Sequence, residues 1–413
     1  MAIPNINRER LWQAHLDMAH IGPTPEGGSR RLALSVEDGQ ARALLQYWCR
    51  PLGLTVEHDA IGNFFARRAG TEDVPAVAFG SHLDTVPTGG RFDGVSGVLA
   101  GLEVMRALDE AGLRTRRPLE LVNWTNEEGS RFRPAMMGSR VHAHELSLAQ
   151  ALATKDDAGV SVAEALREMG MYSTALPRPR APGPRDWAAW IELHIEQGPM
   201  LEATNTDIGI VTGTMHARYF QISIVGEASH AGATPMERRH DSLAAAAEII
   251  LADERIARAA EPGGRGSASW IENIPNARGN VSDITKLHCD VRHSDPARTA
   301  TMEGELRAAI KEIAERRGVW VEIDPYAIFG PVVFDTKVCD VLRRKAGERQ
   351  YSVRDAMAAA GHDSVLVAAL CPSAMLFIPC AGGITHNPKE STTPEQVARG
   401  AQVLLDAVLE LAG

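Results

Sequence analysis

Five short segments of the chain combine histidines and carboxylates with glycine-rich turns. They are residues 80–90 with His82 and Asp84, 91–97 with Asp93, 126–129 with Glu127 and Glu128, 192–199 with His194 and Gln197, and 382–388 with His386. Imidazole nitrogens and carboxylate oxygens are the ligands that zinc and similar divalent ions take in proteins. Taken singly, each segment has an ordinary explanation, because an Asp-Gly pair is usually a turn. Their combination in one chain predicts a metal-dependent site.

Four of these segments end a predicted strand or lie just beyond it. The apolar runs 75–79, 119–124, 190–194 and 374–379 predict strands, and apolar spacing predicts helices over 93–111, 335–349 and 393–411. Strands that alternate with helices favour a mostly parallel sheet covered on both faces. In such α/β sheets ligands collect beyond the carboxyl ends of the strands, which is where these side chains fall.

The pattern changes after Gly213. Residues 219–225 and 287–292 alternate as half-buried strands do, 318–323 predicts another strand, and helices are expected over 241–260 and 295–317. This βαββαβ-like order indicates a small α+β, ferredoxin-like domain inserted into the larger one. We therefore expect a catalytic domain made of residues 1–212 and 329–413 and an inserted domain over residues 213–328.

Composition narrows the class of protein. The 413 residues carry 43 basic and 53 acidic side chains, a net charge of −10, which argues against a nucleic-acid partner. The start of the chain lacks the apolar stretch of a signal peptide, and no apolar run approaches the length of a membrane helix. Five scattered cysteines without a CxxC pair argue against disulfides and a thiolate zinc site. We expect a cytoplasmic enzyme without a membrane partner.

Together the motifs resemble the M20 family of two-zinc amidohydrolases and peptidases. The similarity is greatest to the hydantoinase/carbamoylase branch and rests on residues 89–94 (Gly-Gly-Arg-Phe-Asp-Gly), 126–132, 194–199, 229–236 and 360–363. It implies a zinc-peptidase-like catalytic domain and an inserted domain that serves as lid and dimerisation domain of a homodimer. It also implies two divalent ions per subunit, zinc first, with manganese, cobalt and nickel as alternatives.

The resemblance also implies a role for each motif residue. Asp93 would bridge the two metals, one held by His82 and His194 and the other by Glu128 and His386. Glu127 would be the general base, and Asp84 would orient His82 through its second ring nitrogen. Substrate contacts would come from Gln197, Asn280, Arg292, Gly361 and His362, and His230 of the partner subunit would face the oxyanion. On pattern alone, Arg292 fits a solvated strand face equally well.

The expected reaction is hydrolysis of the N-carbamoyl or ureido group of a small carboxylate, with release of ammonia and carbon dioxide. N-carbamoyl-L-amino acids, allantoate and β-ureidopropionate remain alternative substrates. An M20 aminoacylase or dipeptidase, and a metal-loaded binding protein without catalysis, are the competing functions. The sequence departs from the family at Ser364, where alanine is usual, and we expect an effect on substrate preference. His142 and His144, without further ligands nearby, are interpreted as surface residues.

Overall fold

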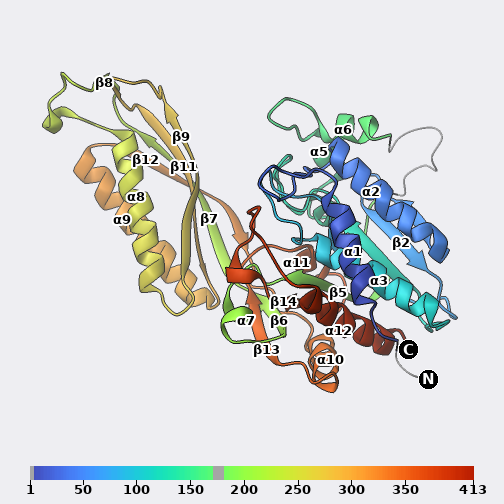
Figure 1. Ribbon diagram of the computed structural model, residues 1–413. Helices are drawn as coiled ribbons and strands as arrows, with labels where there is room; N and C mark the ends of the chain where they lie inside the picture. Colours follow the sequence, from blue (N-terminus) through green and yellow to red (C-terminus); the bar gives the residue numbers. More distant parts are fainter. Residues whose placement is uncertain (1–3, 171–180) are drawn as a thin grey trace. The chain divides into compact units, whose positions relative to one another are not determined.

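The computed structural model describes residues 4–170 and 181–413. The chain divides into two compact units (Figure 1). The larger unit comprises Met1–Thr212, Phe334–Ala356 and Gly361–Gly413, and the smaller comprises Gly213–Val333 and Met357–Ala360. The chain thus leaves the larger unit twice, first to build most of the smaller one and then to add the short segment Met357–Ala360.

The larger unit contains a sheet of eight strands in the order β1-β2-β4-β3-β5-β14-β6-β13. Their bounds are β1 Thr55–His58, β2 Phe64–Arg68, β3 Ala76–His82, β4 Leu119–Trp124, β5 Trp187–Ile195, β6 Ile208–Thr214, β13 Val353–Ala358 and β14 Ser373–Ile378. The central strands β4, β3, β5 and β14 are parallel to one another, whereas β2 and β6 join them antiparallel. The sheet is therefore mostly parallel at its centre, as predicted, and the carboxyl ends of four strands meet at one edge.

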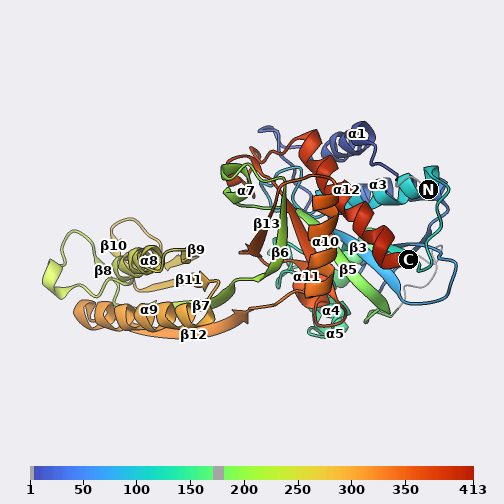
Figure 2. The same cartoon turned by 90° about the horizontal axis from the view of Figure 1, so that it is seen from below.

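Helices cover both faces of this sheet, as Figure 2 shows from below. They are α1 Arg8–Ala19, α2 Val36–Cys49, α3 Val95–Glu110, α4 Met137–His142, α5 Leu148–Ala153, α6 Val162–Glu168, α7 Met200–Ala203, α10 Thr336–Glu348, α11 Asp363–Val367 and α12 Pro394–Ala412. Gly101 of α3 lies against Phe79 and Leu121 on one face. Val367 of α11 joins a buried cluster with Ala78 and Val122 on the other. Helices thus pack against both faces of the sheet.

His142 is buried, which corrects its interpretation as a surface residue. It is 1% exposed, and its ring stacks on Trp187 at 5.1 Å and meets Trp124 edge-on at the same distance. The polar stretch around it hid this position, because the aromatic neighbours come from β4 and β5, far away in the sequence.

The smaller unit is built on a four-stranded antiparallel sheet in the order β12-β7-β11-β9. Its elements are β7 His216–Val225, β8 Ser229–His230, α8 Ser242–Ala259, β9 Arg265–Ile274, β10 Asn280–Val281, β11 Ile284–His293, α9 Pro296–Arg317 and β12 Trp320–Phe329. Helices α8 and α9 pack on one sheet face through a buried cluster that includes Ile249, Ile310 and Leu287. β8 and β10 form a separate two-stranded ladder.

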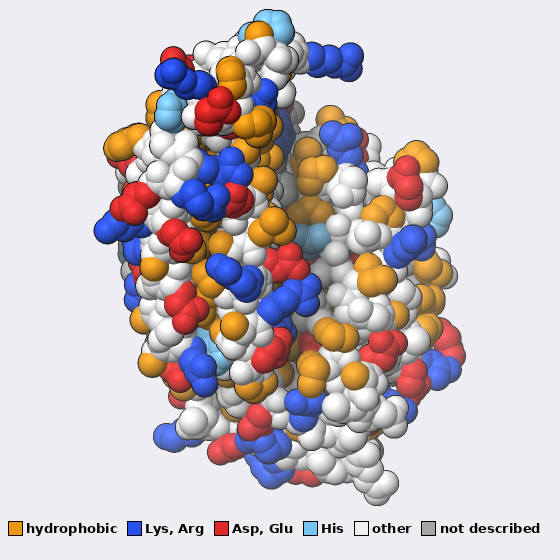
Figure 3. Space-filling model, turned by 90° about the vertical axis from the view of Figure 1, so that its left-hand side faces the viewer, with side chains coloured by type: hydrophobic (Ala, Val, Ile, Leu, Met, Phe, Trp, Pro, Cys, Tyr) orange, Lys and Arg blue, Asp and Glu red, His pale blue; other side chains and the backbone are white. Residues whose placement is uncertain are grey.

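The surface carries both signs of charge. In Figure 3, basic side chains stand beside acidic ones, and neither sign forms a continuous patch on the face shown. Glu248 of α8, in contact with Arg316 and Arg317 of α9, is one such pairing. All five cysteines are unpaired. Within residues 4–170 and 181–413, every helix is too short or too polar to cross a bilayer.

Candidate metal centre and active site

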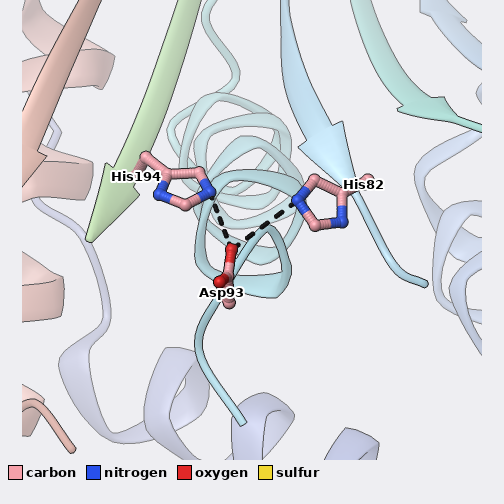
Figure 4. A group of neighbouring side chains, drawn as sticks. All are labelled: His82, Asp93 and His194. Atoms are coloured by element: carbon pink, nitrogen blue, oxygen red, sulfur yellow. Dashed lines mark ion pairs between the residues drawn. The ribbon is translucent and has the colours of Figure 1, made fainter. Parts of the chain in front are cut away.

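The ends of the parallel strands bring the predicted ligands of the larger unit together. His82 is the last residue of β3, His194 lies near the end of β5, and Glu127 and Glu128 follow β4. Asp93 precedes α3, whose first residue is Val95, two positions after the predicted start. His386 lies in the loop between β14 and α12. Figure 4 shows the imidazoles of His82 and His194 pointing at the Asp93 carboxylate from neighbouring strands.

The backbone sets the orientation of both imidazoles. Nδ1 of His82 donates to the carbonyl oxygen of Asp84 and Nδ1 of His194 to that of Ile195, each at 2.9 Å. Their Nε2 atoms lie 3.7 Å and 3.1 Å from Asp93 Oδ1. When the rings are neutral, as metal binding requires, each Nε2 carries a lone pair on the side of the Asp93 carboxylate; that of His194 also accepts the backbone N–H of Gly94 at 3.2 Å. Such a donor set suits a cation between them.

Gly94 allows this approach. A β-carbon at position 94 would lie 2.4 Å from the His82 ring, and the residue has a φ of +65°. Only glycine fits both conditions, so the Asp93-Gly94 pair is required by the neighbouring ligand.

A second group of ligands uses the other oxygen of Asp93. Nε2 of His386 lies 3.4 Å from Asp93 Oδ2 and 3.4 Å from Glu128 Oε2. The described residues form three candidate metal groups, and two of them, His82-Asp93-His194 and Asp93-Glu128-His386, share Asp93; the third is Glu192-His194-His362. A single carboxylate with one oxygen in each group is the arrangement expected of a bridging ligand.

Burial and neighbouring carboxylates shift the pKa values of the ligands in this pocket. Burial lowers the pKa of His82 to about 4, whereas at His194 the hydrogen bond and charge of Asp93 outweigh burial and raise the pKa to about 9. Burial and nearby carboxylates, Asp93 foremost, raise the pKa of Glu128 well above its ordinary value. Ionised carboxylates confined at this density repel one another, and a divalent cation relieves that repulsion. The residues present therefore fit a pair of divalent ions.

Glu127 lies beside this ligand set. Its Oε2 is 3.6 Å from Nε2 of His82, and the side chain is 8% exposed. Burial, followed by the charges of Asp363 and Glu128, raises the pKa of Glu127 well above its ordinary value. A carboxylate whose ionised form is disfavoured is a good proton acceptor, which suits general-base work.

Asp84 contacts the second ring nitrogen of His82, as predicted, but through its main chain and not through its carboxylate. Its main-chain oxygen orients His82, whereas its carboxylate is 4.0 Å from that ring nitrogen. The two carboxylate oxygens instead accept the backbone N–H groups of Glu127 and Glu128, both at 3.2 Å. The side chain therefore fixes the turn that carries both glutamates, a contact that residue spacing does not reveal.

Two predicted substrate contacts of the larger unit also adjoin the metal ligands. Gln197, at a φ of +57°, donates its amide N–H to Asp93 Oδ2 at 2.8 Å. His362, which follows Gly361 and precedes α11, is buried and meets the His194 ring edge-on at 4.5 Å. The buried Gln197 Oε1 and His362 Nε2 have no hydrogen-bond partner within the described part of the chain. Both atoms are therefore unsatisfied polar atoms beside the ligand set.

The remaining predicted residues lie in the smaller unit. His230 on β8 pairs with Asn280 on β10. Nδ1 of His230 accepts the backbone N–H groups of Gly232 and Ala233, both at 3.1 Å. In a neutral ring the proton is then on Nε2, which is a donor.

Arg292 lies on β11, in the four-stranded sheet. Its Nε and Nη2 bind the Asp290 carboxylate at 2.8 Å and 3.0 Å, and Nη1 donates to the carbonyl oxygen of Ala359 at 2.8 Å. The guanidinium is thus held in one orientation by its own unit.

The sequence patterns missed a group of polar residues behind the ligands. Glu192 is fully buried and accepts the hydroxyl groups of Ser81 at 2.6 Å and Ser364 at 2.5 Å. Ser364 also accepts the indole N–H of Trp190 at 2.6 Å. Ser364 therefore belongs to the buried polar group behind the ligands, and its expected effect on substrate preference stays a prediction. Glu390, four residues after His386, was missed too, although a carboxylate so near a ligand was a usable signal.

Comparison with known proteins agrees with this geometry. The family model described as "Peptidase family M20/M25/M40" matches residues 78–410 of the chain. An N-carbamoyl-L-amino-acid amidohydrolase of Rhizobium meliloti is 39% identical over 100% of this chain and 99% of its own. A ureidoglycolate hydrolase of Arabidopsis thaliana is 34% identical over 94% of this chain and 83% of its own.

Solved structures extend the similarity to the whole fold. The crystal structure of an amidase of the hydantoinase/carbamoylase family from Burkholderia vietnamiensis has a TM-score of 0.92 and 41% identity, with 99% of this chain and 98% of that chain covered. Ligand motifs, mostly parallel sheet and full-length similarity lead to one conclusion. The chain belongs to peptidase family M20/M25/M40, and within it to the hydantoinase/carbamoylase amidases.

Proposed function

We propose that the protein hydrolyses the N-carbamoyl or ureido group of a small carboxylate at a two-metal site. The observation that carries the proposal is Asp93, whose two carboxylate oxygens face different ligand groups. The relatives support the substrate class, since they include amidohydrolases of N-carbamoyl-L-amino acids and ureidoglycolate hydrolases. Ureidoglycolate thereby joins the substrates expected from the motifs.

His82 and His194 would hold one ion, Glu128 and His386 the other, and Asp93 both. When bound, the ions supply Lewis acidity that lowers the pKa of a water and polarises the scissile carbonyl. Glu127 takes the proton of the attacking water and delivers it to the leaving nitrogen. Ammonia departs, and the carbamate that remains loses carbon dioxide to give the amine.

The smaller unit would supply recognition and act as a lid and dimerisation domain. Arg292, preset by Asp290, offers the guanidinium geometry that pairs with a substrate carboxylate. His230 presents its Nε2–H to the oxyanion, and its neighbour Asn280, with Gln197 and the Gly361-His362 pair, hydrogen-bonds the substrate's polar groups. β9 and β12 are the outer strands of their sheet, and pairing with a second copy would protect such an edge.

The test is Glu127→Gln, which keeps the shape of the side chain but cannot accept the proton. We expect turnover, measured as ammonia release from a panel of N-carbamoyl amino acids, ureidoglycolate, allantoate and β-ureidopropionate, to fall by at least ~10², with metal content unchanged. The exposed Glu72→Gln is the matched control and retains activity. Retained turnover in Glu127→Gln would refute the assignment. Loss of metal from Glu127→Gln would instead indicate that Glu127 is the metal ligand and Glu128 the general base.

A subunit-mixing experiment tests the proposed dimer. We expect His230→Ala dimers and Glu127→Gln dimers each to be inactive. When His230 acts across the interface, a mixed dimer has one active site with both substitutions and one active site with neither. If His230 acts across the interface, activity returns to about half per mixed dimer. Absence of recovery after demonstrated exchange would place His230 in its own subunit's site or outside catalysis.

A further inference from the structure

A buried glutamate holds the backbone of Asp93 from behind. Glu390 is 4% exposed, and its Oε1 accepts the main-chain N–H groups of Phe92 at 2.8 Å and Asp93 at 3.1 Å. These two N–H groups lie at the turn just before α3, where no helical carbonyl accepts them. The position of Asp93 therefore depends on a residue almost 300 positions further along the chain.

The same carboxylate reaches the Asp93 side chain through a threonine. The hydroxyl oxygen of Thr385 lies 3.0 Å from Asp93 Oδ2 and 3.0 Å from Glu390 Oε2. Thr385 precedes His386, which has a φ of +52° and lies 3.4 Å from Asp93 Oδ2. The loop of residues 385–390 thus holds Asp93 by main chain and side chain while it presents His386 to the same oxygen.

Close packing against Gly90 fixes the position of the Glu390 side chain. A β-carbon at Gly90 would lie 2.1 Å from Glu390 Oε1 and 2.4 Å from Glu390 Cβ. The side chain therefore lies directly on the backbone of the glycine turn that leads to Asp93. This contact gives the second glycine of the Gly89-Gly90 pair a function that the motif alone did not explain.

We propose that Glu390 is a positioning residue that joins Asp93 to the His386 loop, so that the second ligand group forms only with Glu390 in place. The inference rests on the proposed two-metal site. Loss of a carboxylate that orients a metal ligand commonly weakens metal binding 10–100-fold. The ion held by Glu128 and His386 should be affected more than the ion held by His82 and His194, whose imidazoles are oriented independently by main-chain carbonyls.

Titration of the metal-free full-length protein with Co²⁺ tests this, because the visible spectrum of Co²⁺ reports its coordination. We expect wild type to bind two ions and Glu390→Ala to bind the second 10–100-fold more weakly, with an altered spectrum. Glu390→Gln should lie between them, since its carbonyl oxygen can still accept both N–H groups. The control is Glu395→Ala, an exposed carboxylate on α12 that contacts Arg8 and Arg399 and should bind both ions as wild type does.

Thr385→Val, which keeps the shape but removes the hydroxyl, provides an independent readout if Glu390→Ala does not fold by circular dichroism. It too should weaken the second ion selectively. Two ions bound with wild-type affinity and spectrum in Thr385→Val, or in a folded Glu390→Ala, would overturn the inference and leave the proposed function intact. Failure of wild type itself to bind two ions would instead overturn the proposed function.

Discussion

Asp253, a buried acid on α8, should make the smaller unit less stable as pH rises. It is 1% exposed and points toward the sheet, where Gly266 of β9 leaves room for it. Its Oδ1 has no hydrogen-bond partner among the described residues. Burial, and then the charge of Asp290 on β11, raise the pKa of Asp253 from 3.8 to about 7. Burial, followed by the charges of Asp253 and Asp290, raises the pKa of Cys289, which lies on β11 with Asp290.

The sign and size of the effect follow from this shift. At low pH the Asp253 carboxyl is neutral in both the folded and the unfolded state, so its ionisation does not change the free energy of unfolding. The folded-state pKa lies above the unfolded one, so a difference appears only as pH rises. Between about pH 4 and pH 7, Asp253 is ionised in the unfolded chain but still protonated in the folded one. The free energy of unfolding therefore falls by about 1.4 kcal/mol per pH unit. The loss levels off above pH 7 at about 4 kcal/mol, an upper bound because side-chain relaxation reduces it.

Asp253→Asn removes the charge and keeps the shape, so it should stabilise the smaller unit at high pH. We expect the opening free energy of α8, measured by hydrogen-exchange mass spectrometry of the full-length protein, to rise by up to about 4 kcal/mol at pH 8 and by about 1 kcal/mol at pH 4.5. Glu254→Gln, the exposed neighbour that pairs with Arg258, should change it by less than about 0.5 kcal/mol at both pH values. An equal gain for Asp253→Asn at both pH values, or a loss at pH 8, would refute the reasoning.

Two further predictions concern the larger unit. Ser364→Ala should lower its unfolding free energy by about 1–3 kcal/mol, because the buried indole N–H of Trp190 loses its acceptor, and a urea melt in which the variant matches wild type would contradict this. Saturating Zn²⁺ or Mn²⁺ should raise the melting temperature of chelated protein, since a ligand at 100 times its Kd adds about 2.7 kcal/mol per site. A melting temperature that does not respond to either ion would count against the metal centre.

The sequence predicted the centre of the fold well because its signals there are local. The runs that became β3, β4, β5 and β14 are apolar and bounded by glycine or polar turns, so each could be recognised without its neighbours. Helices α1 and α2 were not predicted, although Asn7 and Ser35 are ordinary N-caps whose side chains accept backbone N–H groups.

The positions of the candidate ligands were also inferred from local signals, because parallel strands bring their carboxyl ends to one edge. The contacts that orient them were not accessible in this way. Whether the carbonyl or the carboxylate of Asp84 faces His82 depends on a turn of the backbone, and its carboxylate binds a turn 43 residues later. Glu390 reaches Asp93 across 297 residues. Such contacts depend on tertiary packing, which no spacing rule encodes.

The contacts of Asp93 divide unequally between its two oxygens. Oδ2 has neutral donors from the protein itself, the amide of Gln197 at 2.8 Å and the hydroxyl of Thr385 at 3.0 Å, besides the imidazole of His386. Oδ1 is approached only by the imidazoles of His82 and His194 among its recorded contacts. A carboxylate that must serve two ligand groups cannot rotate toward one without leaving the other. The neutral donors on Oδ2 oppose that rotation, so Oδ1 keeps its direction toward the two histidines, where the proposed ion would complete its surroundings.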